Sequence, residues 1–268
     1  MFLKNILRYL RILSLLARIS LMKQMAYRSS FFLAVLGKIL RVTIVLIFFQ
    51  AIFLNVKEIG GWNFNEVILL YATFSLIDFL ISITFHRNLI YFMPDQIRKG
   101  DYDFKIIKPI NLLFYSSLES LDMMDLVSVI PTLFLLFYAF LKVGFAFSIL
   151  QFLIYIFLIL NALVFLYALI VLLATINFWA VQKNGLGRFY ESIVRIARYP
   201  TTIYDGFWKI LFIYILPISV ISQVPTEGLL GKLSWQYLGY VLIFSILLLM
   251  VAIRFWKFGL KRYSSASS

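Results

Sequence analysis

The chain has 268 residues, of which 63% are hydrophobic and only 14% are charged, against about 25% charged residues in soluble domains. These values exclude a soluble globular protein, and the continuous apolar runs exclude a membrane barrel, whose strands alternate. The absence of cysteine excludes disulfides and cysteine-based metal sites. A net charge of +13 could suit nucleic acid, but the basic residues gather beside the apolar runs, which indicates orientation in a membrane and no nucleic-acid partner.

Residues 1–28 are predicted to form a basic amphipathic helix on the membrane surface. At 100° per residue, four cations fall within an arc of about 80°, and leucine and isoleucine occupy the rest of the wheel. These cations are Lys4, Arg8, Arg11 and Arg18. They would face anionic lipid headgroups, so membrane lipid is the first expected partner. Because they interrupt any apolar core and no small-residue cleavage site follows, a removable signal peptide is the less favoured alternative.

The apolar runs predict six membrane-spanning helices in one domain that covers residues 1–268. Several of these runs approach the roughly 20 residues that a helix needs to cross a bilayer. The expected spans are 31–56, 67–85, 122–141, 148–175, 207–222 and 235–255. Pro131 and Pro217 fall inside the third and fifth spans and predict kinks there.

The basic residues also predict the orientation, with both termini in the cytoplasm. In this orientation 22 of the 25 Lys and Arg residues lie on the inner side, and only Lys57, Lys142 and Lys232 lie outside. The polar stretch 182–205 is then cytoplasmic. The outer linker 224–234 is too apolar for a free loop.

We expect this linker to form a short interfacial or re-entrant element. Thr226 is placed to cap a helix that runs through Leu233 and that lies in the outer leaflet or dips into it.

No motif for chemistry is visible in the sequence. The string GLLGKL (228–233) has neither the spacing nor the hydroxyl residue of a phosphate-binding P-loop. His86 is the only histidine, and neither H-E-x-x-H nor G-x-S-x-G occurs. The sequence therefore predicts no enzyme activity, no metal site and no cofactor bound by this chain.

Four acidic residues near or inside the spans are candidates for a polar pathway or for contacts between subunits. Asp78 lies near the middle of the second span, where an ionised carboxylate costs several kcal/mol unless it is paired or hydrated. It could couple to protons, or it could pair with Lys38 or Arg41 of the first span. The other three recur every three residues, which predicts one helical face at the inner end of the third span, directed at a partner subunit or at water. These are Glu119, Asp122 and Asp125.

The hydrophilic stretch 93–110 separates two apolar runs. Its first part is predicted to be a short helix with a proline and an aspartate at its start, an isoleucine as its apolar knob and a glycine at its end. The residues of this helix are Pro94, Asp95, Gln96, Ile97, Arg98, Lys99 and Gly100. Irregular chain is expected after it. A merely solvated loop would not need Phe104, Ile106 and Ile107, so these residues indicate docking onto membrane helices or onto another protein.

At these residues the chain resembles the permease subunits of ABC-2 type ABC transporters, in the bacterial branch with small six-span subunits. The resemblance extends over nearly the whole chain, and no single string is a catalytic signature. The strings that carry it are IRKGDYDFKIIKPINLLF (97–114), RYPTTIY (198–204), the tail FGLKRYSSASS (258–268) and, more weakly, GGWNFNEVILLY (60–71).

The resemblance implies an all-α membrane protein of six transmembrane helices that follow an amphipathic interfacial helix. It implies two permease subunits, identical or different, served by two ABC ATPase subunits that bind ATP and Mg²⁺. Residues 94–100 would be the coupling helix that docks on the ATPase, and 224–234 the membrane-dipping element. It further implies export of an amphipathic or hydrophobic substrate across the bacterial cytoplasmic (inner) membrane. The alternatives are an ion-coupled secondary transporter that uses Asp78 and a scaffold that does not transport.

Overall fold

The computed structural model describes residues 2–25, 28–144, 148–179 and 185–263. Residues 264–268 of the tail motif and 182–184 of the second polar stretch lie outside them. Every regular element in the described part of the chain is helical. The α-helices are α1 (Phe2–Met25), α2 (Arg28–Phe53), α3 (Phe64–Ile81), α4 (Met93–Lys99), α5 (Asp103–Ile106), α6 (Leu112–Leu118), α7 (Val129–Val143), α8 (Ile149–Ile176), α9 (Gly185–Ile196), α10 (Gly206–Ile210), α11 (Gln223–Leu229) and α12 (Trp235–Lys261). Shorter π- and 3-10-helical segments are η1 (Ser82–His86), η2 (Asn88–Phe92), η3 (Met123–Ser128), η4 (Thr201–Ile203), η5 (Leu211–Ile215) and η6 (Ile218–Val220).

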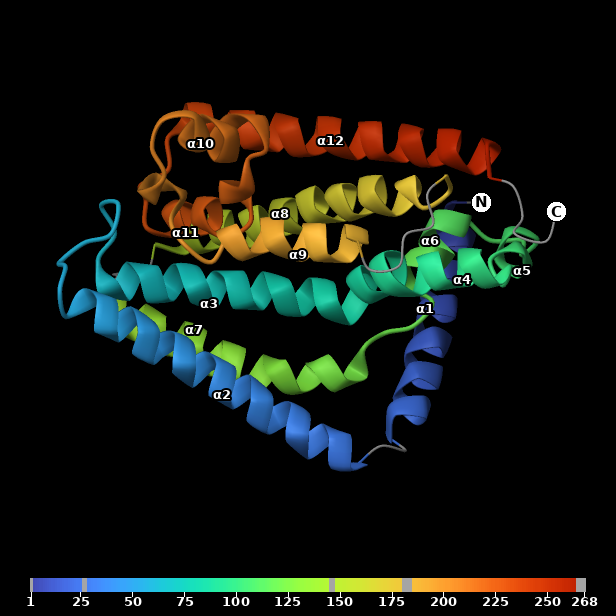
Figure 1. Ribbon diagram of the computed structural model, residues 1–268, viewed down its shortest axis with the longest axis horizontal. Helices are drawn as coiled ribbons and strands as arrows, with labels where there is room; N and C mark the ends of the chain where they lie inside the picture. The colour runs from blue at the N-terminus through green and yellow to red at the C-terminus, as the bar shows by residue number, and fades with distance from the viewer. Residues whose placement is uncertain (1, 26–27, 145–147, 180–184, 264–268) are drawn as a thin grey trace.

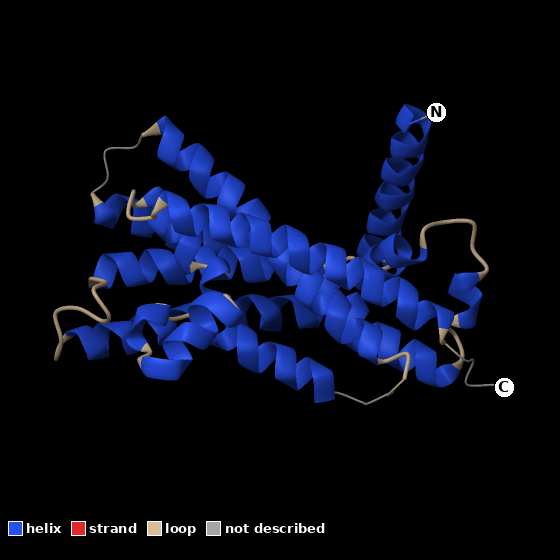
Figure 2. Ribbon diagram, turned by 90° about the horizontal axis from the view of Figure 1, so that it is seen from above, coloured by secondary structure: helices blue, strands red, loops and turns tan. Residues whose placement is uncertain are grey.

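The long helices lie along one axis, and α1 crosses one end of the bundle (Figures 1 and 2). α8 packs against α12 and α3, α3 also contacts α7, and α2 lies beside α3 and α7. The α2–α3 connection, α10 and α11 are at one end of the bundle, and α4, α5 and α6 are at the other (Figure 1). We call these the α10 end and the α4 end. α1 and the last residues of α12 also lie at the α4 end, as expected for an interfacial helix that precedes the first span.

Four helices of the described residues are long and apolar enough to cross a membrane. They comprise residues Val35–Phe53, Phe64–His86, Ile149–Ile176 and Trp235–Lys261. Two shorter apolar helices cover Val129–Val143 and Gly206–Ile215. The all-helical, multi-pass membrane character predicted from the sequence is confirmed, whereas six full-length spans are not.

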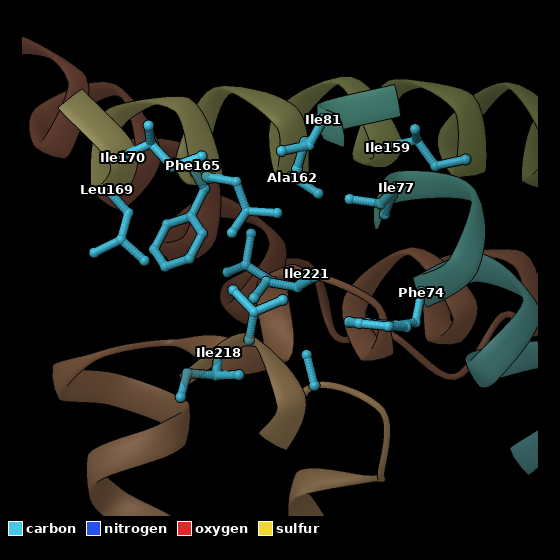
Figure 3. Close-up of a cluster of buried hydrophobic side chains, with 14 of the residues drawn as sticks. Phe74, Ile77, Ile81, Ile159, Ala162, Phe165, Leu169, Ile170, Ile218 and Ile221 are labelled. Atoms are coloured by element: carbon cyan, nitrogen blue, oxygen red, sulfur yellow. The ribbon is translucent and has the colours of Figure 1, made fainter. Parts of the chain in front are cut away.

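The core lies where α3 and α8 meet the segment that follows α10. Phe74 and Ile77 of α3, Phe165 of α8, and Ile218 and Ile221 around η6 are each no more than 1% exposed, and they lie together in Figure 3. A helix that is apolar all round can be buried on every side, and this is the situation of α3 and of the second part of α8, residues 161–176. The first part of α8 has exposed apolar side chains, such as those of Leu153 and Phe157. The packing of α3 and α8 draws the segment around η6 into the protein interior.

The second span and the predicted coupling helix form one rod. Asn63 caps its start by accepting a hydrogen bond from the Glu66 backbone N–H at 3.1 Å, and helical backbone continues from Phe64 through η1 and η2 to Lys99. The predicted short helix is present as α4, with Pro94 in its first turn and Gly100 after its end, but it continues the second span instead of being separate from it. Within a regular α-helix the proline ring would clash with the preceding turn, but here the wider π-helical turn of η2 directly precedes it.

The third predicted span is interrupted at its start. The backbone N–H groups of Leu121 and Asp122 donate to Ser20 Oγ at 3.0 Å and to the Ile83 carbonyl at 3.1 Å, so they do not continue α6. The three acidic residues predicted to share a helical face therefore do not share one. Pro131 lies in the first turn of α7 and not in its interior, and in a first turn the missing N–H of proline removes no hydrogen bond within the helix.

The fifth predicted span, 207–222, is not a continuous helix. The backbone leaves helical geometry at Leu216 (φ −126°, ψ 82°), because Pro217 disfavours helical geometry in the residue before it. α9, which the sequence placed in a cytoplasmic loop, instead returns along α8 toward α11 (Figure 1). Thr202 then donates its hydroxyl to the Gly60 carbonyl at 2.8 Å, although these two residues were predicted on opposite sides of the membrane.

Gly60 makes this close approach possible. It has a positive φ of 57°, and a Cβ there would lie 2.6 Å from Thr202 Oγ1. We infer that α9 and the residues after it carry the chain from the α4 end to the α10 end, and that residues 206–229 fold back at the α10 end.

The predicted element at 224–234 differs in position and environment. The helix is α11, which begins at Gln223, and Thr226 lies inside it with its hydroxyl donating to the Ser222 carbonyl at 2.7 Å. α11 packs against α8 and α3 and is largely buried. Thr226 is therefore not the cap. The helix is buried against α8 and α3, which does not fit an interfacial helix, and the re-entrant alternative stays a prediction.

Candidate functional site

The most polar part of the fold is the α4 end, where the chain reverses between the rod and α6. Gly100, with φ 80°, ends α4 in the left-handed conformation that glycine adopts without strain. The next residues form α5, a short helix that the sequence did not predict, instead of irregular chain. α5 packs against α6.

A buried ion pair holds this reversal together. The side chain of Lys105 is 6% exposed, and its ammonium pairs with Glu119, which also accepts a hydrogen bond from Gln96 Nε2 at 3.1 Å. The phenol of Tyr102, likewise buried, lies 3.0 Å from Ser116 Oγ. Burial lowers the pKa of Lys105, and the neighbouring carboxylate of Glu119 opposes this effect. Glu119 therefore neutralises a buried cation of its own chain.

The residues of the predicted coupling helix divide into two groups. Pro94 is buried and Ile97 is only 3% exposed, as part of the hydrophobic core, so Ile97 is not the projecting knob that the sequence predicted. Asp95, Arg98 and Lys99 face outward, and the carboxylate of Asp95 contacts Arg98 at 2.7 Å and Lys99 at 2.8 Å. Hydrogen bonds from Lys99 and Arg98 lower the pKa of Asp95 to about 2.

An exposed apolar patch lies just beyond these charges. We define the α5 patch as Phe104, Ile106 and Ile107, whose exposed fractions are 68%, 41% and 78%. The sequence singled out these residues for docking on membrane helices or on another protein. The described residues of this chain leave these three side chains exposed, which favours docking on another protein over docking on its own membrane helices.

Contacts from distant parts of the sequence fix the reversal, and sequence reasoning missed them. Arg8 of α1 donates to the Pro109 carbonyl at 2.8 Å, and the ring of Tyr9 packs edge-on against Phe114. At the other end of the chain, Tyr263 donates to a carboxylate oxygen of Asp103 at 2.9 Å. The only sequence signal for these contacts is that α1, α12 and the polar reversal were predicted on the same side of the membrane.

The remaining acidic candidates each pair with a cation of this chain. Asp122 pairs with Arg87, and Asp125 lies 3.0 Å from Lys38 Nζ. Asp78 lies 3.7 Å from Arg41 Nη2, and the two residues line one small polar pocket.

A second polar surface runs along α9. On its exposed side lie Arg188, Glu191 and Arg195, and Glu191 accepts a hydrogen bond from the phenol of Tyr91 on the rod. On the opposite side Tyr190 and Val194 are buried. The amphipathic period of GLGRFYESIVRI was the signal available in the sequence, but its charges led to its placement in the cytoplasm.

Comparison with known proteins gives one result. A family model described as ABC-2 family transporter protein matches residues 39–267. No curated protein and no solved structure matches the chain.

Proposed function

The chain belongs to the ABC-2 family of transporter proteins, and from this premise we propose that it is the permease subunit of an ATP-driven exporter. Two ABC ATPase subunits supply ATP and Mg²⁺ to the complex, and a second permease subunit, identical or different, completes the translocation pathway. The substrate is amphipathic or hydrophobic, and the membrane is the bacterial cytoplasmic membrane. In this assignment the α4 end faces the cytoplasm.

The rod supports a mechanical role for the α4 end. Because helical backbone is continuous from Phe64 to Lys99, a displacement of α4 moves the membrane-spanning part of the same helix. The two π-helical segments in this rod are of a kind often found at functional sites. An ATPase can bias the permease only if it binds its two conformations differently, and a rod that joins its docking site to the bundle provides that link.

The exposure of the α5 patch supports docking of the ATPase at the α4 end. This is the single observation on which the proposal rests most heavily. The three exposed apolar side chains belong to the same short segment as the exposed cations of Arg98, Lys99 and Lys108, and apolar residues among charged ones are typical of a protein interface. The buried pair of Lys105 and Glu119 holds the patch in place from beneath.

The exposed charges of α9 support the presence of a second permease subunit in the complex. Charged side chains at the depth of the hydrocarbon face a bundle interior or a water-filled cavity, because lipid contact is costly. Arg188, Glu191 and Arg195 are exposed in the single chain. A translocation pathway shared with a second subunit would give these residues water and polar partners.

The decisive test is to replace two residues of the α5 patch by aspartate. We expect the double substitution of Phe104→Asp and Ile107→Asp to weaken association with a co-expressed ABC ATPase subunit about 30-fold, because removing central apolar anchors of an interface costs roughly 2 kcal/mol or more. The measurement is co-purification of the ATPase with the tagged permease from membranes, followed by titration of the purified proteins.

The matched control is Leu54→Asp, at a residue that is 81% exposed at the α10 end. This variant should retain the ATPase fully. Normal association of the α5 double variant, with transport intact, would contradict the coupling role. Transport that persists without ATP but collapses with the proton gradient would support the ion-coupled alternative instead.

A further inference from the structure

The structure leaves an apolar groove on the membrane-facing side between α2 and α7. Its cavity measures about 730 Å³, which is within the range of pockets for small ligands. Residues from α2 such as Ile39, Val42 and Leu46 line one wall, and Phe134 and Leu135 of α7 line the other. Along α2 the groove extends from Val35 to Gln50, about 22 Å at 1.5 Å per residue.

A polar pocket adjoins this groove toward the α4 end. The two cavities share Val42 and Pro131 as lining residues, and the polar one is lined by Lys38, Arg41 and Ser128 among others. The hydroxyl of Ser128 is buried and, among the residues that the structure describes, has no hydrogen-bond partner. A buried hydroxyl that lacks a partner favours a polar ligand or water in this pocket.

The cations of the polar pocket retain donors for such a ligand. Arg41 lies 3.7 Å from Asp78, longer than a hydrogen bond, and its side chain is 40% exposed. Lys38 contacts Asp125 at 3.0 Å and is 33% exposed, and an ammonium carries three donors. A phosphate that approaches from the membrane can therefore contact both cations without displacing either carboxylate.

From this arrangement we propose that the α2–α7 groove binds one acyl chain of an anionic phospholipid, whose phosphate is held by Lys38 and Arg41. An acyl chain is the occupant that the surrounding bilayer supplies, and it restores the dispersion contacts that an empty apolar groove would lack. The cations select the anionic headgroup, because basic residues near the membrane surface attract anionic lipids. The part of the groove beyond the cations, from Val42 to Gln50, is about 12 Å long along α2, which accommodates the first part of one acyl chain in a hydrocarbon layer of about 30 Å. This site stands whether or not the protein exports lipid.

The proposal is tested with the full chain in lipid nanodiscs that contain a photoreactive phosphatidylglycerol or a photoreactive phosphatidylcholine. We expect phosphatidylglycerol to label peptides of α2 and α7 several-fold more than phosphatidylcholine does. Thr43→Trp, on the groove wall, should lower this labelling about fivefold. The matched control, Ile44→Trp, changes an adjacent residue that is 63% exposed and does not line the groove, so it should leave the labelling unchanged.

A separate experiment tests whether the positive charges of Lys38 and Arg41 select the lipid headgroup. The double variant Lys38→Gln and Arg41→Gln should remove the preference for phosphatidylglycerol, and Lys38→Arg with Arg41→Lys should keep it. If Thr43→Trp fails to fold, Ile39→Trp fills the same groove from one turn earlier. Equal labelling by both lipids, or labelling that groove-filling variants leave unchanged, would overturn the proposal. Photocrosslinking of the groove to a second copy of the chain in place of lipid would also overturn it.

Discussion

A cysteine that replaces Asp205 should react with a membrane-impermeant maleimide from the same side of the membrane as a cysteine that replaces Lys57. When the maleimide is added on the side from which it labels a cysteine at Lys99, it should not react with the cysteine at position 205. The reason is the contact of Thr202 with the Gly60 carbonyl, which places residues 201–205 at the α10 end beside the α2–α3 connection. Because the natural chain has no cysteine, each variant carries a single reactive group.

The experiment uses intact cells and inverted vesicles, so the expected result is all or none. Asp205 is exposed and makes no capping hydrogen bond through its side chain, and replacing it should not disturb the fold. Cysteines at Lys57 and Lys99 serve as the markers of the two sides. If the Asp205 variant is labelled together with the Lys99 variant, the stretch 182–205 is cytoplasmic, as the basic residues predict, and α9 does not carry the chain across.

The error at the fifth span shows how far composition determines this fold. Long apolar runs predicted helices that the structure contains, because twenty apolar residues in lipid must satisfy their backbone groups within a helix. Residues 207–222 are equally apolar, but Pro217 breaks the helix and α3 and α8 bury the following segment. The more polar α9 instead runs alongside α8. Hydropathy measures the preference for leaving water, and it does not distinguish lipid from a protein interior.

The sequence predicted where the polar segment at the α4 end lies in the chain, but it did not predict the contacts that this segment makes. Its charge density and its place between two apolar runs identified 93–110 as the segment outside the membrane. Which apolar residue projects depends on the rotation of the rod, and that rotation buries Ile97 while α5 exposes Phe104 and Ile107. Likewise, the spacing of Glu119, Asp122 and Asp125 implied a shared face, but each carboxylate has its own cation, on α5, the rod and α2 respectively.

The largest loss of stability should follow from Glu119→Ala. This variant leaves the buried ammonium of Lys105 without its carboxylate, and removal of one partner of a buried ion pair costs about 3 kcal/mol. For a chain of this size we expect the thermal unfolding midpoint of the purified full-length protein to fall by roughly 6–12 °C, as followed by tryptophan fluorescence. Arg98→Ala, which removes one contact of the exposed group around Asp95, is the matched control and should change the midpoint by no more than about 2 °C.

The stability loss in Glu119→Ala should depend on pH in a direction that a simple loss of packing would not produce. Because burial lowers the pKa of Lys105 below its ordinary 10.5, the folded chain binds the proton less tightly than the unfolded chain. Stability from this group therefore rises with pH up to about 10.5. The loss in Glu119→Ala should shrink over the alkaline range, because the neutral amine is less costly to bury. The double variant Lys105→Met with Glu119→Leu should recover most of the midpoint at neutral pH. A Glu119→Ala protein that unfolds at the wild-type temperature would show that Lys105 is not buried and that the α5 patch has no ion pair beneath it.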